Sequence, residues 1–176
     1  MARIKALDLE QSPPNATEIL KEIELAFGRI PNLFKTYAQH PPLLKANWDK
    51  VKAVMMQGVL SRKVKETIAV LVSQDNSCNY CVAAHTAALK SIGTTDEEIR
   101  RITQDVGGAD FAPKEKALIA FARKANRDPL RISDTEFNSL RQTGASDTEI
   151  IEALGVMEVF TAFNKFLDAL QVDIDL

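Results

Sequence analysis

The sequence predicts an all-α protein. Apolar residues recur at spacings of three and four along most of the 176 residues, glycines and capping residues end those stretches, and strand-like alternation is almost absent. We expect a single domain over residues 1–176. It would consist of an N-terminal helical extension at about 1–58, a core at about 61–93 and C-terminal helices at about 95–170.

The composition is that of a globular protein, with 45% apolar and 26% charged residues and a formal net charge of −2. This argues against disordered, collagen-like and coiled-coil chains. With no long block of like charge, nucleic acid and anionic membranes are not expected partners. The first residues lack the apolar stretch of a signal peptide, and no apolar run approaches the ~20 residues of a membrane span. We therefore expect a cytoplasmic protein.

The first helix is expected to begin with a capping box formed by Asn15 and Glu18 and to end at Gly28, in the position of a C′ glycine. A short segment, Asn32 to Gln39, is apolar on one side and precedes two prolines. Two elements joined by a tight turn are therefore predicted at the N-terminus.

A longer helix is expected after Pro41 and to be closed by Gly58, with His40 as a helix-end residue. Ser61 can cap the next helix, which would run to about Gln74. That helix is apolar nearly all round, so we expect it at the centre of the molecule.

The polar turn of Asp75, Asn76 and Ser77 offers side chains that can cap a helix from Cys78 to about Ser91. The two helices would form an antiparallel hairpin. Further helices are predicted by three capping boxes and by a proline at a first helical position: Thr95 to Glu98, Ser133 to Glu136, Ser146 to Glu149, and Pro113, which opens a helix to about Asn126.

The last helix, from about Asp147 to Leu170, is too apolar for a single buried stripe. Either it is buried on two sides within one chain, or it packs against a partner subunit. We favour the partner subunit.

Reactive side chains concentrate in the hairpin. The chain holds two cysteines and two histidines, and Cys78, Cys81 and His85 lie at positions i, i+3 and i+7, on one helical face. The first turn of a helix carries partial positive charge, which lowers the pKa of a cysteine placed there. His85 is one turn beyond Cys81 and could accept its proton.

Glu66 is expected opposite His85. In a hairpin that turns near residues 75 and 76, positions whose numbers sum to about 151 lie level, and 66 and 85 satisfy this. A carboxylate beside the imidazole would fix its tautomer and keep it basic. The sequence therefore predicts a line of four groups: Glu66, His85, Cys81 and Cys78.

Simpler interpretations remain open. The cysteines could be small apolar core residues, although Asn79 and the polar turn favour an accessible site. Cys78, Cys81 and His85 could contribute to a zinc site, although zinc usually takes four ligands and no third cysteine exists. Glu66 could be an exposed residue paired with Arg62 or Lys63. Tyr80 is expected to be a packed residue at the rim of the site, with an auxiliary proton-donating role as the alternative.

The string Glu66, Cys78-Asn-Tyr80-Cys81 and His85 resembles the signature of the AhpD-like alkylhydroperoxidases, in the carboxymuconolactone decarboxylase superfamily. The stretch from Arg29 to Phe34 is similar to the peroxidase-related branch. The best-studied members of that family carry a second histidine where this chain has Tyr80.

The resemblance implies an AhpD-like all-α fold, a homo-oligomer (trimer or hexamer), and reduction of hydroperoxides with no cofactor and no metal. It further implies that Cys81 forms a sulfenic acid, that Cys78 resolves it to a disulfide, and that Glu66 and His85 relay protons. A thiol or dithiol reductant would complete the cycle. The alternatives are a general disulfide oxidoreductase and a non-enzymatic redox-sensing module.

Overall fold

The computed structural model of the chain describes residues 2–175, and all regular secondary structure within these residues is helical, as predicted. The α-helices are α1 (Pro14–Phe27), α2 (Asn32–Tyr37), α3 (Pro41–Val51), α4 (Arg62–Asp75), α5 (Asn79–Ser91), α6 (Asp96–Gln104), α7 (Pro113–Arg127), α8 (Asp134–Gln142) and α9 (Asp147–Leu170). Shorter helical turns are η1 (Leu9–Gln11), η2 (Lys52–Met56), η3 (Val106–Gly108) and η4 (Pro129–Arg131).

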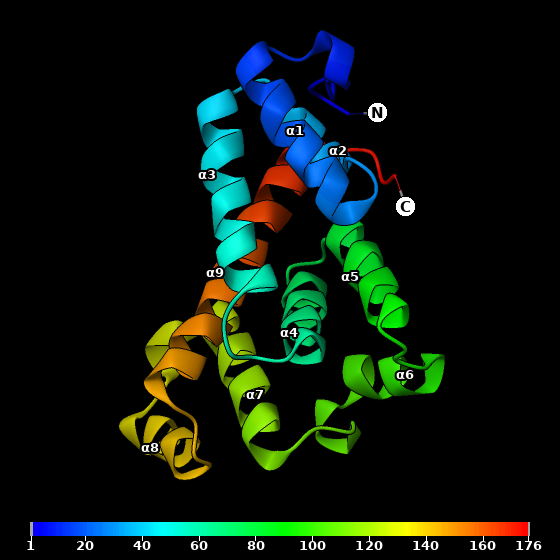
Figure 1. Cartoon of the computed structure of the whole chain (residues 1–176). Coiled ribbons are helices and arrows are strands. Elements are labelled where there is room, and N and C mark those ends of the chain that lie inside the picture. The colour runs from blue at the N-terminus through cyan, green and yellow to red at the C-terminus, as the bar shows by residue number, and fades with distance from the viewer. Residues whose placement is uncertain (1, 176) are drawn as a thin grey trace.

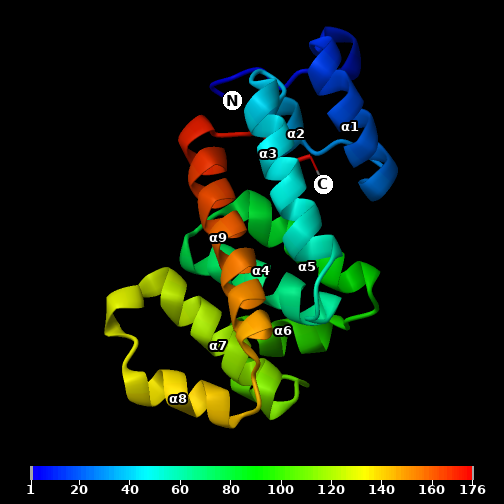
Figure 2. The ribbon, with the colours of Figure 1, turned by 60° about the vertical axis from the view of Figure 1, so that its left-hand side comes forward.

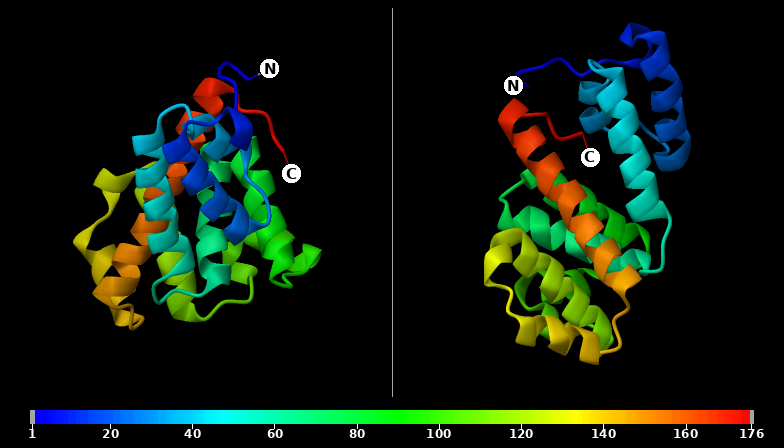
Figure 3. Two further views of the ribbon diagram at one scale, coloured as in Figure 1. Left: turned by 45° about the horizontal axis from the view of Figure 1, so that its top comes forward. Right: turned by 90° about the vertical axis from the view of Figure 1, so that its left-hand side faces the viewer.

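Helix α4 is the central element, as its all-round apolar sequence predicted. It contacts α5, α7 and α9 (Figure 1), and ten consecutive residues from Val64 to Ser73 are buried. Helices α1 to α3 gather at one end of the molecule together with both ends of the described chain, as Figure 3 shows. Helix α8 lies on the periphery at the opposite end.

Helix α9 is buried within the chain, and the favoured expectation of a partner subunit is not needed to explain its sequence. It crosses α4 and α7 and also touches α5 (Figure 2), so apolar residues on several of its sides are covered. None of the helices in residues 2–175 is both long and apolar enough to cross a membrane.

Several predicted helix starts need correction. Helix α1 begins at Pro14, without the capping box expected at Asn15, because proline at the first helical position already has the helical φ. The box at Thr95 is only half formed, since Glu98 bonds to Asp110 N (2.7 Å) and Lys63 instead of the Thr95 backbone. The reciprocal boxes at Ser133 and Ser146 are confirmed.

The helix after Pro41 ends in a different way from that expected. The α-helical part, α3, ends at Val51. The chain then forms the π-helical turn η2, which ends at Met56, two residues before Gly58. His40 is a helix-end residue as predicted, because its Nδ1 accepts a hydrogen bond from Leu43 N (3.3 Å).

A buried ion pair fastens the loop between η2 and α4. Lys65 Nζ lies 2.6 Å from Glu152 Oε1, and Glu152 also accepts the backbone N–H of Val59 (2.7 Å). Gly58 has φ +92, and a Cβ there would lie 2.2 Å from Glu152 Oε1. Only glycine fits both the backbone conformation and the space.

We therefore expect Gly58→Ala to destabilise the fold. Gly144→Ala is the matched control, since Gly144 has φ +85 and no atom within 4 Å of an added Cβ. The control should lose about 1–2 kcal/mol from backbone strain alone. Gly58→Ala should lose a further ~1–3 kcal/mol from displacing Glu152. Urea unfolding measures both losses, and equal losses would show that the contact with Glu152 contributes nothing.

Candidate functional site

The hairpin of α4 and α5 carries the predicted site. The Ser61 hydroxyl caps α4 as expected, accepting Val64 N (3.3 Å). The side chains of the turn, however, do not cap α5 as predicted. Asp75 instead pairs with Arg123, and Asn76 bonds to Asn126. Arg123 and Asn126 are both on α7, so the side chains of the turn are used in contacts with that helix. The turn is thereby fixed to a neighbouring helix.

The predicted contact between Glu66 and His85 is confirmed. Glu66 Oε2 lies 2.7 Å from His85 Nδ1, and the Glu66 side chain is only 8% exposed. The interpretation of Glu66 as an exposed surface residue is therefore wrong, although Arg62 Nε also approaches its other oxygen, at 3.6 Å. With Nδ1 bonded to the carboxylate, the Nε2 atom of His85 is left to exchange protons.

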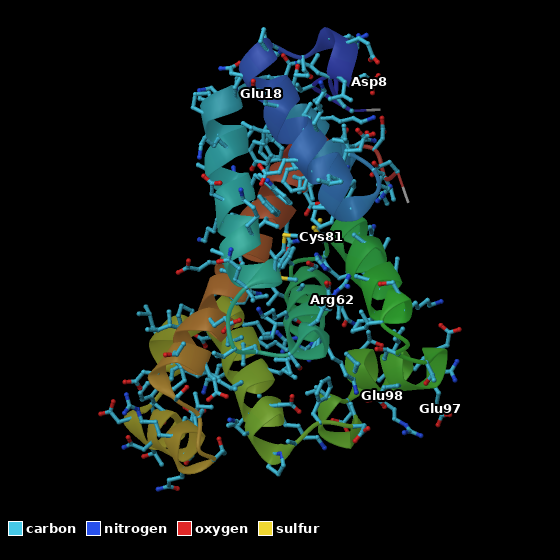
Figure 4. All side chains as sticks on the ribbon, viewed as in Figure 1. Asp8, Glu18, Arg62, Cys81, Glu97 and Glu98 are labelled. Carbon is cyan, nitrogen blue, oxygen red and sulfur yellow. The ribbon has the colours of Figure 1, made fainter. Side chains whose placement is uncertain are left out.

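Both cysteines are free thiols, and both are buried, with Cys78 0% and Cys81 3% exposed. The expectation of an accessible site is wrong for the single chain, because α9 covers this side of the hairpin. Figure 4 shows Cys81 in the interior of the bundle. Cys78 is the N-cap residue of α5, and Cys81 is at the third helical position. Both lie where the unpaired N–H groups of the first turn are found.

The two thiols act on each other. The pKa of Cys78 is lowered because the Cys81 thiol donates a hydrogen bond to its sulfur, and the Cys81 backbone N–H adds a second bond. The pKa of Cys81 is raised by Cys78 and by burial. The first proton therefore leaves the pair readily, whereas the second is held strongly.

Helix α9 supplies residues that the sequence reasoning missed. Phe160, Asn164 and Asp168 follow one another at spacings of four and face His85, Cys81 and Cys78 in turn. The Phe160 ring stands edge-on to the imidazole, with 4.1 Å between the ring centroids. Hydrogen bonding from Asn164 works to lower the pKa of Cys81, and Asp168 works to raise the pKa of Cys78. The available signal was a pair of polar residues four apart, Asn164 and Asp168, among the apolar residues of the second half of the helix.

The Tyr80 hydroxyl does not bond to the cysteines or to His85, but to Asp175 and Leu33. It donates to Asp175 Oδ1 (2.8 Å) and accepts from Leu33 N (3.4 Å), and the side chain is buried. Burial and the neighbouring Asp175 raise the pKa of Tyr80. Tyr80 is thus the packed rim residue that was expected, and it ties α5 to the C-terminal segment.

The possible metal ligands of the described residues do not form a cluster. Within residues 2–175, no three His, Cys, Asp or Glu side chains come together in an arrangement that could hold a metal ion. The arrangement that is present, a carboxylate on an imidazole and two adjacent thiols, suits thiol chemistry with proton transfer.

The fold and the site together define an all-helical dithiol protein, and comparison with known proteins shows which proteins it is similar to. A model described as "Carboxymuconolactone decarboxylase family" matches residues 41–124. That segment is similar to the family, and the fold of the chain is AhpD-like, as the sequence predicted.

Three similar proteins illustrate the relationship. An alkyl hydroperoxide reductase of Mycobacterium tuberculosis is 33% identical over 79 residues, which are 45% of this chain and 23% of that protein. An uncharacterised peroxidase-related protein with an AhpD core from Ralstonia eutropha JMP134 superposes with a TM-score of 0.87 and 24% identity, over 99% of this chain and 92% of that one. The debrominase Bmp8, solved with 2,3,4-tribromopyrrole, has a TM-score of 0.79 and 19% identity over 92% and 86% of the two chains.

The chain spans less than two thirds of the length of the curated relatives it matches. The structural neighbours show that the fold is shared by proteins of more than one activity. The roles of Cys78, Cys81, His85, Glu66 and Tyr80 therefore stay predictions at this point.

We expect Asp168→Asn to lower the pKa of Cys78, since the Asp168 carboxylate accepts the thiol proton and repels the thiolate. The substitution should be made with Cys81→Ser, so that Cys78 is the single thiol of the chain. The pH dependence of alkylation by iodoacetamide measures the shift. Glu158→Gln, a change of another exposed α9 carboxylate, paired with Lys50, is the control. An unchanged titration in Asp168→Asn would contradict the contact.

Proposed function

We propose that this protein is a thiol-dependent peroxidase that reduces alkyl hydroperoxides. The observation that carries the proposal is the hydrogen bond that the Glu66 carboxylate accepts from His85, which lies one helical turn from Cys81. The name of the mycobacterial relative, an alkyl hydroperoxide reductase, supports the same reaction class. So does the AhpD core of the structural neighbour.

The first step forms a sulfenic acid on Cys81. His85 Nε2 takes the proton of the Cys81 thiol, while Glu66 holds Nδ1 and stabilises the imidazolium. The thiolate attacks the terminal oxygen of the hydroperoxide, and the O–O bond breaks. The sulfur gives up two electrons, and the alkoxide leaves as an alcohol after taking a proton from His85.

The second step forms a disulfide. The sulfur of Cys78 attacks the Cys81 sulfenic acid and expels hydroxide, which becomes water on protonation. The Cys81 backbone N–H, which bonds to the Cys78 sulfur, still favours the Cys78 thiolate after Cys81 has been oxidised. An external thiol or dithiol then reduces the disulfide. Within this scheme no cofactor or metal is required.

Access to the thiols is proposed from the side of Cys78. A recess of about 200 Å³ lies between the start of α5 and the end of α9, with Asn79, Leu167 and Asp168 among its lining residues. Both the peroxide and the reductant would enter there. Assembly into a trimer or hexamer and a cytoplasmic location remain predictions from the sequence.

The cysteine roles are tested by single substitutions. We expect Cys81→Ser to abolish consumption of an organic hydroperoxide, because the attacking sulfur is gone. Cys78→Ser should react once and stop at a sulfenic acid, which dimedone traps and mass spectrometry detects. Full turnover by Cys81→Ser would disprove the proposal. The reversed pattern, with the trapped acid on Cys78, would exchange the two roles.

Glu66→Gln should lower the turnover of hydroperoxide by roughly 10²–10³-fold, since a neutral amide cannot stabilise the His85 imidazolium. Glu98→Gln is the matched control, because Glu98 has a similarly buried side chain (12% exposed) but pairs with Lys63. Steady-state kinetics with an alkyl hydroperoxide measure the effect. Equal losses in the two variants would show that the carboxylate of Glu66 acts only on stability.

Two alternative functions can be distinguished from the peroxidase with the wild-type protein and the same variants. A general disulfide oxidoreductase would reduce an insulin-type disulfide faster than an organic peroxide. A redox-sensing module would oxidise its dithiol once per subunit without turnover. Counting catalytic cycles per subunit with both substrates distinguishes these outcomes from a peroxidase.

A further inference from the structure

Asn164 is a polar residue on the buried side of α9, between the buried aromatic residue Phe163 and Leu167 one turn further on. It is completely buried, and its side chain lies where α9 crosses the hairpin of α4 and α5. Burying an amide is costly unless its hydrogen bonds are made. The partners of Asn164 therefore show what the residue does.

The orientation of the Asn164 amide is set by neighbouring side chains. Its Oδ1 accepts a hydrogen bond from Asn76 Nδ2 (3.0 Å). Asn76 is in turn oriented by Asn126, since the two amides bond reciprocally (3.2 and 3.1 Å), and Thr161 donates to Asn126 Oδ1 (2.8 Å). With Oδ1 turned toward Asn76, the NH₂ group of Asn164 must face the opposite way, toward Ser73 and Cys81.

Two hydrogen-bond donors are left for the sulfur of Cys81. An amide nitrogen carries two hydrogens, and one of those on Asn164 Nδ2 is given to Ser73 Oγ (2.9 Å). Ser73 is fully buried and accepts this bond, so its own hydroxyl hydrogen is available to a second acceptor. The backbone of Ser73 also lies at the motif, because its carbonyl accepts Cys78 N (2.9 Å).

We propose that Asn164 and Ser73 are positioning residues that favour the thiolate form of Cys81, by directing one N–H and one O–H at its sulfur. The inference rests on the proposed function for its role in turnover, because only a peroxidase needs that thiolate to attack an oxygen. Hydrogen bonds to a charged sulfur are stronger than those to a neutral thiol, so the pair favours the anion.

Opposing effects act on the Cys81 sulfur, and the net shift in its pKa is upward while Cys78 lies beside it. Cys78 and burial raise the pKa of Cys81, and the hydrogen bonds from Asn164 and Ser73 oppose them by lowering it. The other titratable groups around the site are His85 on α5, Glu66 on α4 behind His85, and Asp168 on α9 beside Cys78. Asn164 and Ser73 are neutral, so they favour the thiolate without adding a titrating group.

The test uses Cys78→Ala protein, in which Cys81 is the single thiol of the chain. The thiolate of Cys81 is titrated by its ultraviolet absorbance and by the pH dependence of alkylation. Ser73→Ala and Asn164→Leu, each added to this background, should raise the pKa of Cys81 by about one unit. That shift corresponds to about a tenfold smaller thiolate fraction at neutral pH.

Two controls separate this role from a structural one. Ser73→Thr keeps the hydroxyl and should keep the titration of the parent. Thr67→Val removes another buried hydroxyl of α4, one without a hydrogen-bond partner within residues 2–175, and should leave the pKa of Cys81 unchanged. If Asn164→Leu does not fold, as circular dichroism would show, Ser73→Ala still tests the proposal.

The outcomes distinguish this inference from the proposed function. A raised pKa in Ser73→Ala supports the inference even if the wild-type protein turns over no hydroperoxide, which would defeat only the peroxidase proposal. An unchanged pKa in Ser73→Ala, or an equal shift in Thr67→Val, overturns the inference even where peroxide turnover is observed.

Discussion

The register between α4 and α5 is the constraint on which the site depends. The turn at Asn76 and Ser77 is short, and a change of one residue there would rotate Glu66 away from His85. The register is held from outside the hairpin: Asp75 takes two hydrogen bonds from Arg123, each of 2.7 Å, and Asn76 bonds to both α7 and α9. Because the side chain of Asp75 is almost completely buried, this pair is less screened by solvent than a surface ion pair.

Helix α9 converts the hairpin into an enclosed site. An isolated pair of helices would leave the cysteine face in water, and thiols there would be open to unselective oxidation. By crossing the hairpin, α9 removes the thiols from solvent and at the same time brings an aromatic ring, an amide and a carboxylate to the three reactive positions. The contact of α9 with the hairpin of α4 and α5 therefore contributes both to the stability of the fold and to the chemical environment of the thiols.

The sequence was informative where the structure is local. Capping residues and glycines placed most helix ends, and the numbering across a short turn predicted the contact of Glu66 with His85, because a tight hairpin has one register. It was uninformative where helices distant in sequence meet. Ser73 and Asn164 are 91 residues apart, and their contact depends on the angle at which α9 crosses α4, which no local pattern specifies. The burial of Cys78 and Cys81 was missed for the same reason.

The bond from Tyr80 to Asp175 links the motif to the rest of the chain. Asp175 also accepts Asn32 N (2.9 Å), so the first turn of α5, the start of α2 and the C-terminal segment share one carboxylate. Breaking any of these bonds exposes polar groups of the other two. Local opening of the residues around Cys78 and Cys81 is consequently coupled to release of the C-terminal segment, and amide hydrogens in both places should exchange as one cooperative unit.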